Sequence, residues 1–347
     1  MSKADTEKKI QQVLMIPLRR CGSHALRLRL NFISGFYSPY PLHICDMMPL
    51  LPLYRDLADD TNYFQLVADV LGLQSVSLVK WPGVSFEANE FFERIKNRPR
   101  SIHAIVNEIL KEAASVHKAQ VVMDKSLDSI RYWPELMKAD PEMLFLNVVR
   151  DPRAQVSSMN RAIIYEFDSL LNSQIWVRAF EAAESLKKAH PERVLSIRYE
   201  DFIQNEEITL KKVCAFLKLK FVPEMMDISR SEEAQVISKQ SALWESNVLA
   251  PVKANIDKFK KTLTEAEIEC IETVTAPFMK IYGYEPLTKA GFKVDAASLK
   301  EAREQSDEKK KLAWAALKKA KPQDYILRKK RADYIEMCRL NLIKKEG

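Results

Sequence analysis

A short segment near the N-terminus combines residue types that bind phosphate or sulfate groups. It reads Arg20-Cys21-Gly22-Ser23-His24 and separates a short apolar run from an amphipathic stretch. A glycine turn that leads from a strand into a helix presents several backbone N–H groups at the start of the helix, and such groups bind anions. The guanidinium of Arg20 adds a permanent charge with a fork of donors. The segment therefore indicates an anion site, while a simple helix start after a buried strand remains a second interpretation.

The same segment differs from the phosphate loop of nucleoside triphosphatases. The pattern G-x-x-x-x-G-K-[ST] is absent, and no lysine follows Gly22 within the loop. No acidic residue stands here as a strong ligand for magnesium. A site for a magnesium-bound nucleoside triphosphate is therefore disfavoured.

A second segment in the middle of the chain has a similar character. Arg150-Asp151-Pro152-Arg153 follows the apolar run MLFLNVV, and Ser158 comes eight residues after Arg150. Proline is tolerated in the first turn of a helix, so a helix is predicted to begin here. An arginine at the end of a strand and a serine two turns into the next helix can converge on one phosphate. A salt-bridged helix start is the alternative interpretation.

These segments must be positioned by a sheet, and the chain has the pattern of one. Short and nearly continuous apolar runs are typical of strands buried on both faces of a parallel sheet. The predicted strands are Val13–Pro17, Pro41–Cys45, Val76–Val79, Gln120–Met123, Leu144–Val149 and Val194–Tyr199. Helical patterns alternate with them at residues 24–34, 54–71, 101–118, 128–138, 153–163, 170–189 and 206–218. The alternation predicts a single α/β domain with a central parallel sheet flanked by helices, and ligands bind such sheets beyond the carboxyl ends of the strands.

Charge is distributed unevenly along the 347 residues. Residues 300–347 hold 15 basic and 8 acidic side chains, which accounts for the whole net charge of +7. Two charged helical patterns, 295–320 and 323–345, are separated by Pro322 and form a predicted C-terminal helical extension. We divide the chain into a domain of residues 1–290 and a basic helical extension of residues 291–347.

Composition excludes several classes of protein. No run of apolar residues approaches the 18 that a membrane span needs, and the charged start MSKADTEKK lacks the apolar stretch of a secretory signal. The five cysteines are widely spaced and form no C-x-x-C pair, which fits a reducing cytoplasm. Acidic residues interleave with the basic ones of the extension, which argues against nucleic acid as a partner.

Taken together, the two segments make the chain resemble the sulfotransferases that use 3′-phosphoadenosine 5′-phosphosulfate (PAPS). In that family a loop of the type [KR]-S-G-[ST]-[TH] binds the 5′-phosphosulfate, and R-[ND]-P-R-[AD]-x-x-x-S binds the 3′-phosphate. A third element, [RF]-Y-E-D, places a tyrosine against the adenine, and it reads Arg198-Tyr199-Glu200-Asp201 here. The resemblance extends over residues 12–285. It is closer to the bacterial and tyrosylprotein branches than to the cytosolic aryl and steroid branch, whose late R-K-G-x-x-G element is missing.

The resemblance implies a set of donor-binding residues. The residues carried over are Arg19, Arg20, Cys21, Gly22, Ser23, His24, Ala25, Arg150, Ser158, Tyr199 and Lys258. Cys21 stands where the family has a serine, and a thiol donates only weakly. Lys258 is assigned from the late lysine of the tyrosylprotein and bacterial branches. The family needs no metal, and its other product is adenosine 3′,5′-bisphosphate.

The resemblance also implies catalytic roles. Arg20 would stabilise the bridging oxygen, and Lys125, after a predicted strand, would neutralise the sulfuryl oxygens; a solvated loop lysine is the alternative for Lys125. The acceptor needs a general base. His43 is the first choice because histidine titrates near neutrality, although it could instead be a packed core residue, with Asp46 and Asp124 as alternatives.

The expected activity is sulfuryl transfer from PAPS to a hydroxyl or amine of a small molecule. Phe36, Tyr37, Tyr40 and the segment 80–86 are candidates for the acceptor side. Two other functions stay open: a small-molecule kinase of the P-loop type, and a non-enzymatic binder of an anionic partner through the basic extension. The extension is also a candidate contact between two copies of the chain.

Overall fold

A parallel sheet forms the centre of the molecule. The structure is a computed structural model, and it describes residues 9–241, 253–289 and 291–344. Within these residues the sheet has five strands in the order β2-β3-β1-β4-β5, and all neighbours are parallel. The strands are β1 (Gln11–Ile16), β2 (Phe36–Tyr37), β3 (Val121–Asp124), β4 (Leu144–Val149) and β5 (Val194–Arg198). The predicted α/β class with a central parallel sheet is confirmed.

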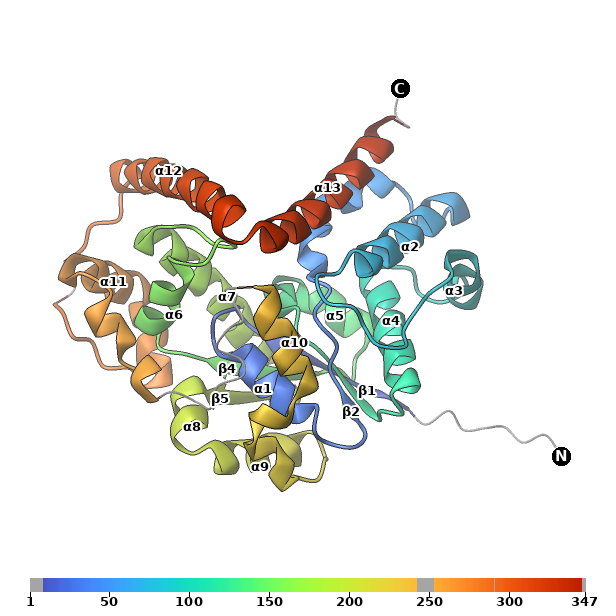
Figure 1. Cartoon of the computed structure of the whole chain (residues 1–347), viewed down its shortest axis with the longest axis horizontal. Coiled ribbons are helices and arrows are strands. Elements are labelled where there is room, and N and C mark those ends of the chain that lie inside the picture. Colours follow the sequence, from blue (N-terminus) through green and yellow to red (C-terminus); the bar gives the residue numbers. More distant parts are fainter. Residues whose placement is uncertain (1–8, 242–252, 290, 345–347) are drawn as a thin grey trace.

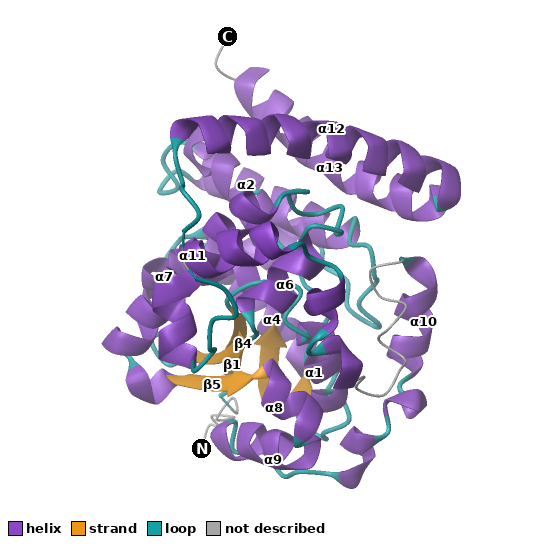
Figure 2. Cartoon of the chain, turned by 90° about the vertical axis from the view of Figure 1, so that its left-hand side faces the viewer, coloured by secondary structure: helices purple, strands orange, loops and turns teal. Residues whose placement is uncertain are grey.

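The apolar runs form strands because both faces of the sheet are covered. Val13 and Met15 of β1 pack on one face, in a cluster with residues of α8 and α9. Leu14 and Ile16 pack on the opposite face, against side chains of α5 and α7. Successive side chains of a strand point to opposite faces, so a strand buried on both sides must be apolar throughout. Figure 2 shows the sheet between α8 and α9 on one side and α7 and α11 on the other.

Helices surround this sheet on every side (Figure 1). The helices are α1 (Ser23–Leu30), α2 (Asp60–Ser75), α3 (Ala88–Ile95), α4 (Ile102–Val116), α5 (Trp133–Ala139), α6 (Pro152–Met159), α7 (Ser169–Ala189), α8 (Tyr199–Gln204), α9 (Glu206–Phe216), α10 (Glu232–Gln240), α11 (Glu265–Tyr282), α12 (Ala296–Ala320) and α13 (Pro322–Lys344). No helix among the described residues is long and apolar enough to cross a lipid bilayer.

Side-chain caps explain where several helices begin. The carboxylate of Asp151 accepts a hydrogen bond from the Arg153 N–H, and Pro152 fills the first turn of α6. Thr264 and Glu267 form a capping box at the start of α11. Such contacts satisfy backbone donors that have no partner inside the helix. The start of α6 at Pro152 agrees with the sequence-based prediction.

Two of the predicted strands are wrong. Residues 41–45 run as a loop into a short 3₁₀ helix (Ile44–Asp46), and His43 has a left-handed φ of 52°. Residues 76–79 continue from the end of α2 as a turn and loop. Both runs are apolar because Leu42 and Val79 are buried in the cluster around α2 and α4, away from any strand partner. The short strand β2 precedes the first of these runs and was not predicted.

The C-terminal extension packs against the rest of the chain. We call α12 and α13 together the arm. In α13, Cys338 and Leu342 are buried in the same cluster as α2, and the Tyr334 hydroxyl donates to the backbone carbonyl of Asp69 over 3.0 Å. A Cβ on Gly72 of α2 would lie 1.8 Å from the Tyr334 oxygen, so glycine is required for this approach. The arm is therefore fitted to α2 along a specific contact, visible at the right of Figure 1.

Candidate active site

A cavity of about 460 Å³ lies beyond the carboxyl ends of β1 and β3. It is the region in which parallel sheets bind ligands. The predicted site residues that line it are Arg19, Arg20, Ser23, His24, His43 and Lys125, together with the alternative base Asp46. Residues of the first loop, the 43–46 turn and the end of β3 are thus brought to one space.

Gly22 shapes the loop after β1. It precedes α1 with φ 86° and ψ 12°, and no side chain caps the helix. A Cβ at Gly22 would lie 2.5 Å from two ring carbons of Tyr199. Glycine is required here both for the left-handed backbone and for the approach of the tyrosine ring. The start of α1 has no side-chain cap, so the prediction that its N–H groups bind an anion stays open.

The first loop, the segment after β4 and the tyrosine after β5 meet at one place. The Arg20 Nε donates to the Ser158 hydroxyl over 3.1 Å, and an Arg150 Nη donates to the Arg20 carbonyl over 2.7 Å. The Arg150 guanidinium lies over the Tyr199 ring at 4.5 Å. Four residues that the sequence assigned to donor binding therefore form one contact group, although they come from three separate segments.

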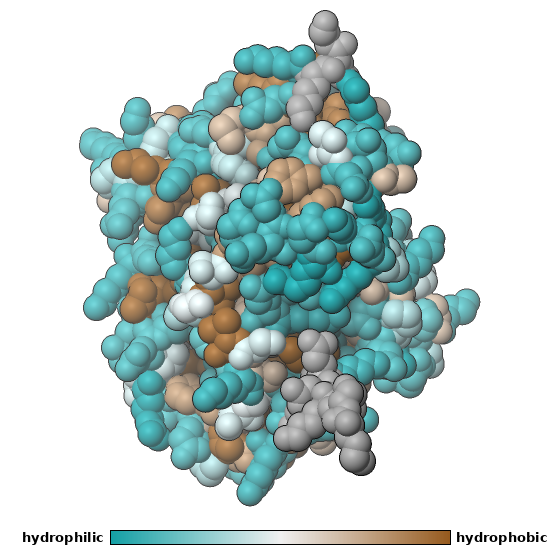
Figure 3. Space-filling model, turned by 90° about the vertical axis from the view of Figure 1, so that its right-hand side faces the viewer, coloured by the Kyte–Doolittle hydropathy of each residue, from teal (hydrophilic) through white to brown (hydrophobic). Residues whose placement is uncertain are grey.

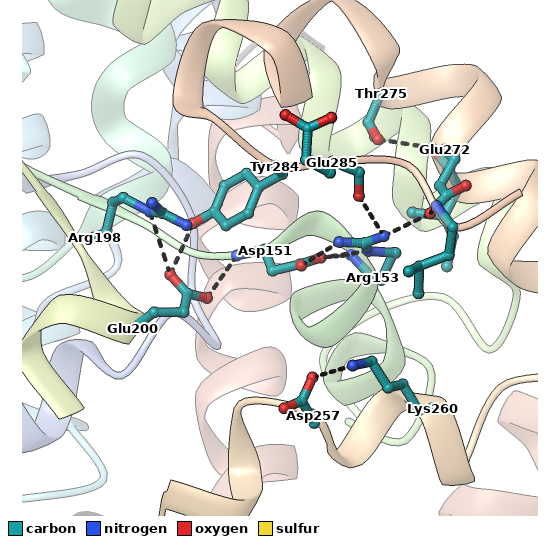
Figure 4. Close-up of polar contacts among 12 residues, drawn as sticks. Asp151, Arg153, Arg198, Glu200, Asp257, Lys260, Glu272, Thr275, Tyr284 and Glu285 are labelled. Carbon is teal, nitrogen blue, oxygen red and sulfur yellow. Dashed lines mark hydrogen bonds and ion pairs between the residues drawn. The ribbon is translucent and has the colours of Figure 1, made fainter. Parts of the chain in front are cut away.

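Asp151 and Arg153, the other polar residues at the end of β4, stabilise the fold. Arg153 is buried and pairs with Asp151 over 2.7 Å and with Glu272 over 2.6 Å. Glu200 accepts the Asp151 N–H over 3.0 Å and the Tyr284 hydroxyl over 2.8 Å, as Figure 4 shows. This network ties the ends of β4 and β5 together. Asp151 and Arg153 thus follow the interpretation as a salt-bridged helix start, which leaves Arg150 and Ser158 for a ligand.

Lys125 is the most unusual charge in the cavity. Its side chain is 1% exposed and lines the cavity, and Asp128, the carboxylate that raises its pKa, already pairs with Arg19. Burial, followed by the charges of Arg27 and Arg19, lowers its pKa to about 7. A buried lysine among other cations is costly unless an anion completes its surroundings. The alternative interpretation, a solvated loop lysine, is therefore wrong.

His43, the first-choice base, lines the cavity. Its backbone N–H donates to the Ser126 hydroxyl over 3.0 Å, and that hydroxyl donates to Asp124 over 2.8 Å. Burial, then Arg19 and Lys125, holds the pKa of His43 well below 6.5, so its imidazole is neutral at pH 7. A neutral imidazole can accept a proton.

The two alternative bases are placed differently. Asp124 is buried, accepts two hydrogen bonds from Ser126 and does not line the cavity. Asp46 lines it but is paired with Arg331 over 3.0 Å. Asp124 thus orients the turn that carries His43, and Asp46 is occupied by an ion pair.

Other predicted donor residues vary in their exposure to the cavity. The Cys21 thiol is fully buried in the core, burial raises its pKa to about 11, and the residue does not line the cavity. Arg19 pairs with Asp128 over 2.7 Å. His24 lines the cavity, and burial followed by Lys125 holds its pKa well below 6.5. Ala25 contributes only its place in the first turn of α1.

Lys258 lies outside the cavity. It is exposed on a short 3₁₀ helix (Lys258–Lys261). The preceding turn approaches the second segment, because Arg150 donates to the Asn255 carbonyl over 3.3 Å. Lys258 is therefore near the Arg150 side of the site, without a contact to it. Of the predicted acceptor-side residues, Tyr40 lines the cavity.

Sequence reasoning missed several residues of the site. Asp128 holds Arg19, and Leu78, Ile163 and Ile164 line the cavity from two loops. The arm supplies a further group, which consists of Trp314, Arg328, Arg331, Ala332 and Ile335. Arg328 and Arg331 stand one helical turn apart, but in a strongly charged stretch this spacing is no distinctive signal.

Comparison with solved structures found chains of similar fold. One solved structure, the sulfotransferase domain from the Synechococcus PCC 7002 olefin synthase, matches with a TM-score of 0.51 and 19% identity over 80% of this chain and 95% of that one. The sulfotransferase domain from the curacin biosynthetic pathway gives a TM-score of 0.49 and 17% identity, over 80% of this chain and 98% of its own. A search of curated protein sequences gave no match.

The family itself is established by a sequence model. Likeness at 19% identity shows the fold alone, and that fold is the one expected from the sequence. The model described as "Sulfotransferase family" matches residues 13–223, which is more than half of the chain and includes the loop after β1, Lys125 and the segment after β4. The chain belongs to the sulfotransferase family.

Proposed function

We propose that this protein transfers a sulfuryl group from PAPS to a hydroxyl or amine of a small-molecule acceptor. The observation that carries the proposal is that Lys125, a buried cation, lines the cavity together with Arg19, Arg20 and the start of α1, which has no side-chain cap. An anionic ligand would bind both the Lys125 ammonium and the N–H groups at the start of α1. The nearby Arg20 adds a third donor on the same cavity wall.

The donor-binding roles follow from the contacts. The 5′-phosphosulfate would be held by Arg20, Lys125 and the N–H groups at the start of α1. The 3′-phosphate would be held by Arg150 and Ser158, which the contact group places near each other through Arg20. Tyr199 would lie against the adenine. Lys258 would approach the phosphates from the neighbouring 3₁₀ helix.

The transfer itself needs a proton acceptor and stabilised charge. PAPS supplies the sulfuryl group: a bond forms from the acceptor oxygen or nitrogen to sulfur, and the bond from sulfur to the 5′-phosphate oxygen breaks. The acceptor proton goes to the neutral imidazole of His43. The bond-breaking electron pair stays on adenosine 3′,5′-bisphosphate, whose growing charge Arg20 and Lys125 stabilise.

Incubation with PAPS and a panel of alcohols, phenols and amines tests the proposal. The expected result is a product heavier by one sulfuryl group, and Arg20→Ala and Arg150→Ala should each abolish it or weaken PAPS binding. Transfer from magnesium–ATP instead would establish the kinase alternative.

Lys258→Ala should weaken PAPS binding. Lys260→Ala is the matched control, because Lys260 is already paired with Asp257 over 2.7 Å. Absence of PAPS binding would overturn the proposal.

Three further expectations accompany this function. All five cysteines are free thiols, which supports a reducing cytoplasmic location.

The division into residues 1–290 and 291–347 stays a proposal, as does a contact between two copies through the arm. Exposed apolar side chains on the arm, such as Leu312 and Ile326, would serve such a contact. The face shown in Figure 3 is mainly hydrophilic with scattered apolar areas.

A further inference from the structure

The cavity has two chemically different walls. Arg20, Ser23 and Lys125 come from the carboxyl edge of the sheet, whereas apolar side chains come from the arm and three loops. The apolar group consists of Tyr40, Leu78, Ile163, Ile164, Trp314, Ala332 and Ile335. Figure 2 shows the arm lying on the far side of α6 from the sheet. The space therefore combines cations from the edge of the sheet with apolar side chains from the arm and loops.

The first helix of the arm holds one of the apolar loops. Ser306 of α12 is fully buried, donates to Glu166 over 2.7 Å and accepts the Phe167 N–H over 3.0 Å. Lys310, one turn further along, pairs with the same Glu166 over 3.0 Å. Since Glu166 follows Ile163 and Ile164 closely in the chain, α12 anchors the loop that carries these two cavity residues.

The second helix of the arm holds the turn that carries His43. One Arg331 Nη donates to the carbonyls of Leu42 and His43, over 2.8 and 3.1 Å, and to the Asp46 carboxylate over 3.0 Å. His43 has a left-handed φ of 52°, which costs free energy for a residue other than glycine. Arg331 therefore stabilises the turn in the conformation that lines the cavity.

The charges of the arm are compensated where they reach the cavity. Arg331 pairs with Asp46, and Arg328 pairs with Asp324 over 2.8 Å. Neither arginine presents an unopposed charge to an acceptor, so the apolar side chains decide what the outer half of the cavity accommodates. An acceptor with an apolar body fits these surroundings better than a sugar or a highly charged molecule.

We propose that the arm forms the acceptor site, that the acceptor is an alcohol with an apolar body, and that Arg331 is a positioning residue for His43. The proposal rests on the proposed sulfuryl transfer. The apolar body would contact Trp314 and Ile335 of the arm on one side and Ile163 and Ile164 on the other. The hydroxyl would then face His43 and the donor site.

A series of straight-chain primary alcohols tests the acceptor class. With the whole chain, kcat/KM should rise by up to about fourfold for each added methylene until the cavity is full, the factor that corresponds to burial of one methylene. Trp314→Ala and Ile335→Ala should flatten this increase while PAPS affinity stays unchanged. Leu312→Ala is the control, because Leu312 lies on α12 but is 70% exposed and does not line the cavity.

Substitutions of Arg331 test the positioning role. Arg331→Ala should lower kcat at least tenfold with unchanged PAPS affinity, and Arg331→Lys should restore part of it. Removal of the cation beside His43 should also raise the pKa of the imidazole, so the acidic limb of the kcat profile should move to higher pH. The control is Arg339→Ala on the same helix, since Arg339 pairs only with the exposed Glu336 among the described residues.

These experiments distinguish failure of the acceptor proposal, of the positioning role and of the proposed function. If sulfation occurs but does not depend on chain length, or if the Trp314 and Ile335 variants keep the full dependence, the acceptor proposal is wrong. If Arg331→Ala matches the Arg339→Ala control in kcat and in pH profile, the positioning role is wrong. A protein that binds no PAPS would instead overturn the proposed function. Circular dichroism of each variant separates loss of folding from these results.

Discussion

Lys125 allows a quantitative test of the donor site. Its ammonium is buried, and its pKa is lowered to about 7 by burial and by Arg27 and Arg19. At pH 8 the free protein should therefore hold this residue about nine-tenths neutral. A bound sulfonate or phosphate favours the charged form, so binding must bring a proton to Lys125. The expected uptake is about 0.9 proton for each PAPS bound at pH 8.

The proton taken up by Lys125 also sets the sign and size of the pH dependence of PAPS affinity. The ammonium is already present below pH 7, so affinity is greatest there and falls as pH rises through the pKa of the free protein. If the bound lysine titrates near 10.5, affinity should weaken about a hundredfold between pH 6 and pH 9, or roughly 3 kcal/mol. Isothermal titration calorimetry in two buffers of different ionisation enthalpy measures both the affinity and the proton uptake.

Two variants isolate the contribution of Lys125 from the titration of the nucleotide itself. Lys125→Arg keeps a permanent charge and should lose the proton uptake at pH 8. Lys125→Met should lose both the uptake and most of the affinity at pH 6. The reasoning is refuted if wild type takes up no proton at pH 8, or if all three proteins take up the same amount.

Three further predictions concern other parts of the site. Gly22→Ala should weaken PAPS binding more than tenfold, measured by calorimetry, because a left-handed alanine costs about 1–2 kcal/mol and its Cβ would displace the Tyr199 ring. Glu272→Gln should lower the free energy of unfolding by about 3 kcal/mol at pH 7, since it leaves the buried Arg153 without one partner. The pKa of Glu272 is lowered in the folded state, so the difference between wild type and variant should shrink as pH falls below about 4.5. Chemical denaturation at several pH values measures this difference. His43→Ala should reduce kcat by about a hundredfold or more with PAPS affinity nearly unchanged, and retention of full kcat would transfer the role of base to Asp46 or Asp124.

The fold was predictable wherever local pattern and tertiary environment agree. β1 and β4 are short apolar runs followed by helix starts, and both are strands in the central sheet. The runs at 41–45 and 76–79 have the same composition, but helices bury them and no strand of the described residues pairs with them. Apolar composition reports burial, and burial alone does not distinguish a central strand from a loop packed under helices.

Contacts within the site were predictable where the residues stand in short, recognisable motifs. The contact of Arg20 with Ser158 follows from two short motifs at the ends of adjacent strands. The contact of Arg331 with Asp46 joins residues 285 positions apart, and neither residue stands in a distinctive motif. In the sequence Arg331 is one of many basic residues that interleave with acidic ones. Its contact with the 43–46 turn arises from the packing of α13, and only the tertiary structure shows that packing.

The cations of the cavity link donor binding to the strength of the base. Burial together with Arg19, Lys125 and Arg331 holds the pKa of His43 well below its ordinary value, so in the free protein the imidazole is neutral and a weak base. Under the proposed function, an anionic donor bound among these charges would cancel part of their field, to the extent that its charge exceeds that of the proton taken up by Lys125, and would raise the pKa of His43. A general base works best when its pKa approaches the operating pH. Donor binding would then strengthen His43 as a base, which would couple proton removal from the acceptor to the presence of the group that it attacks.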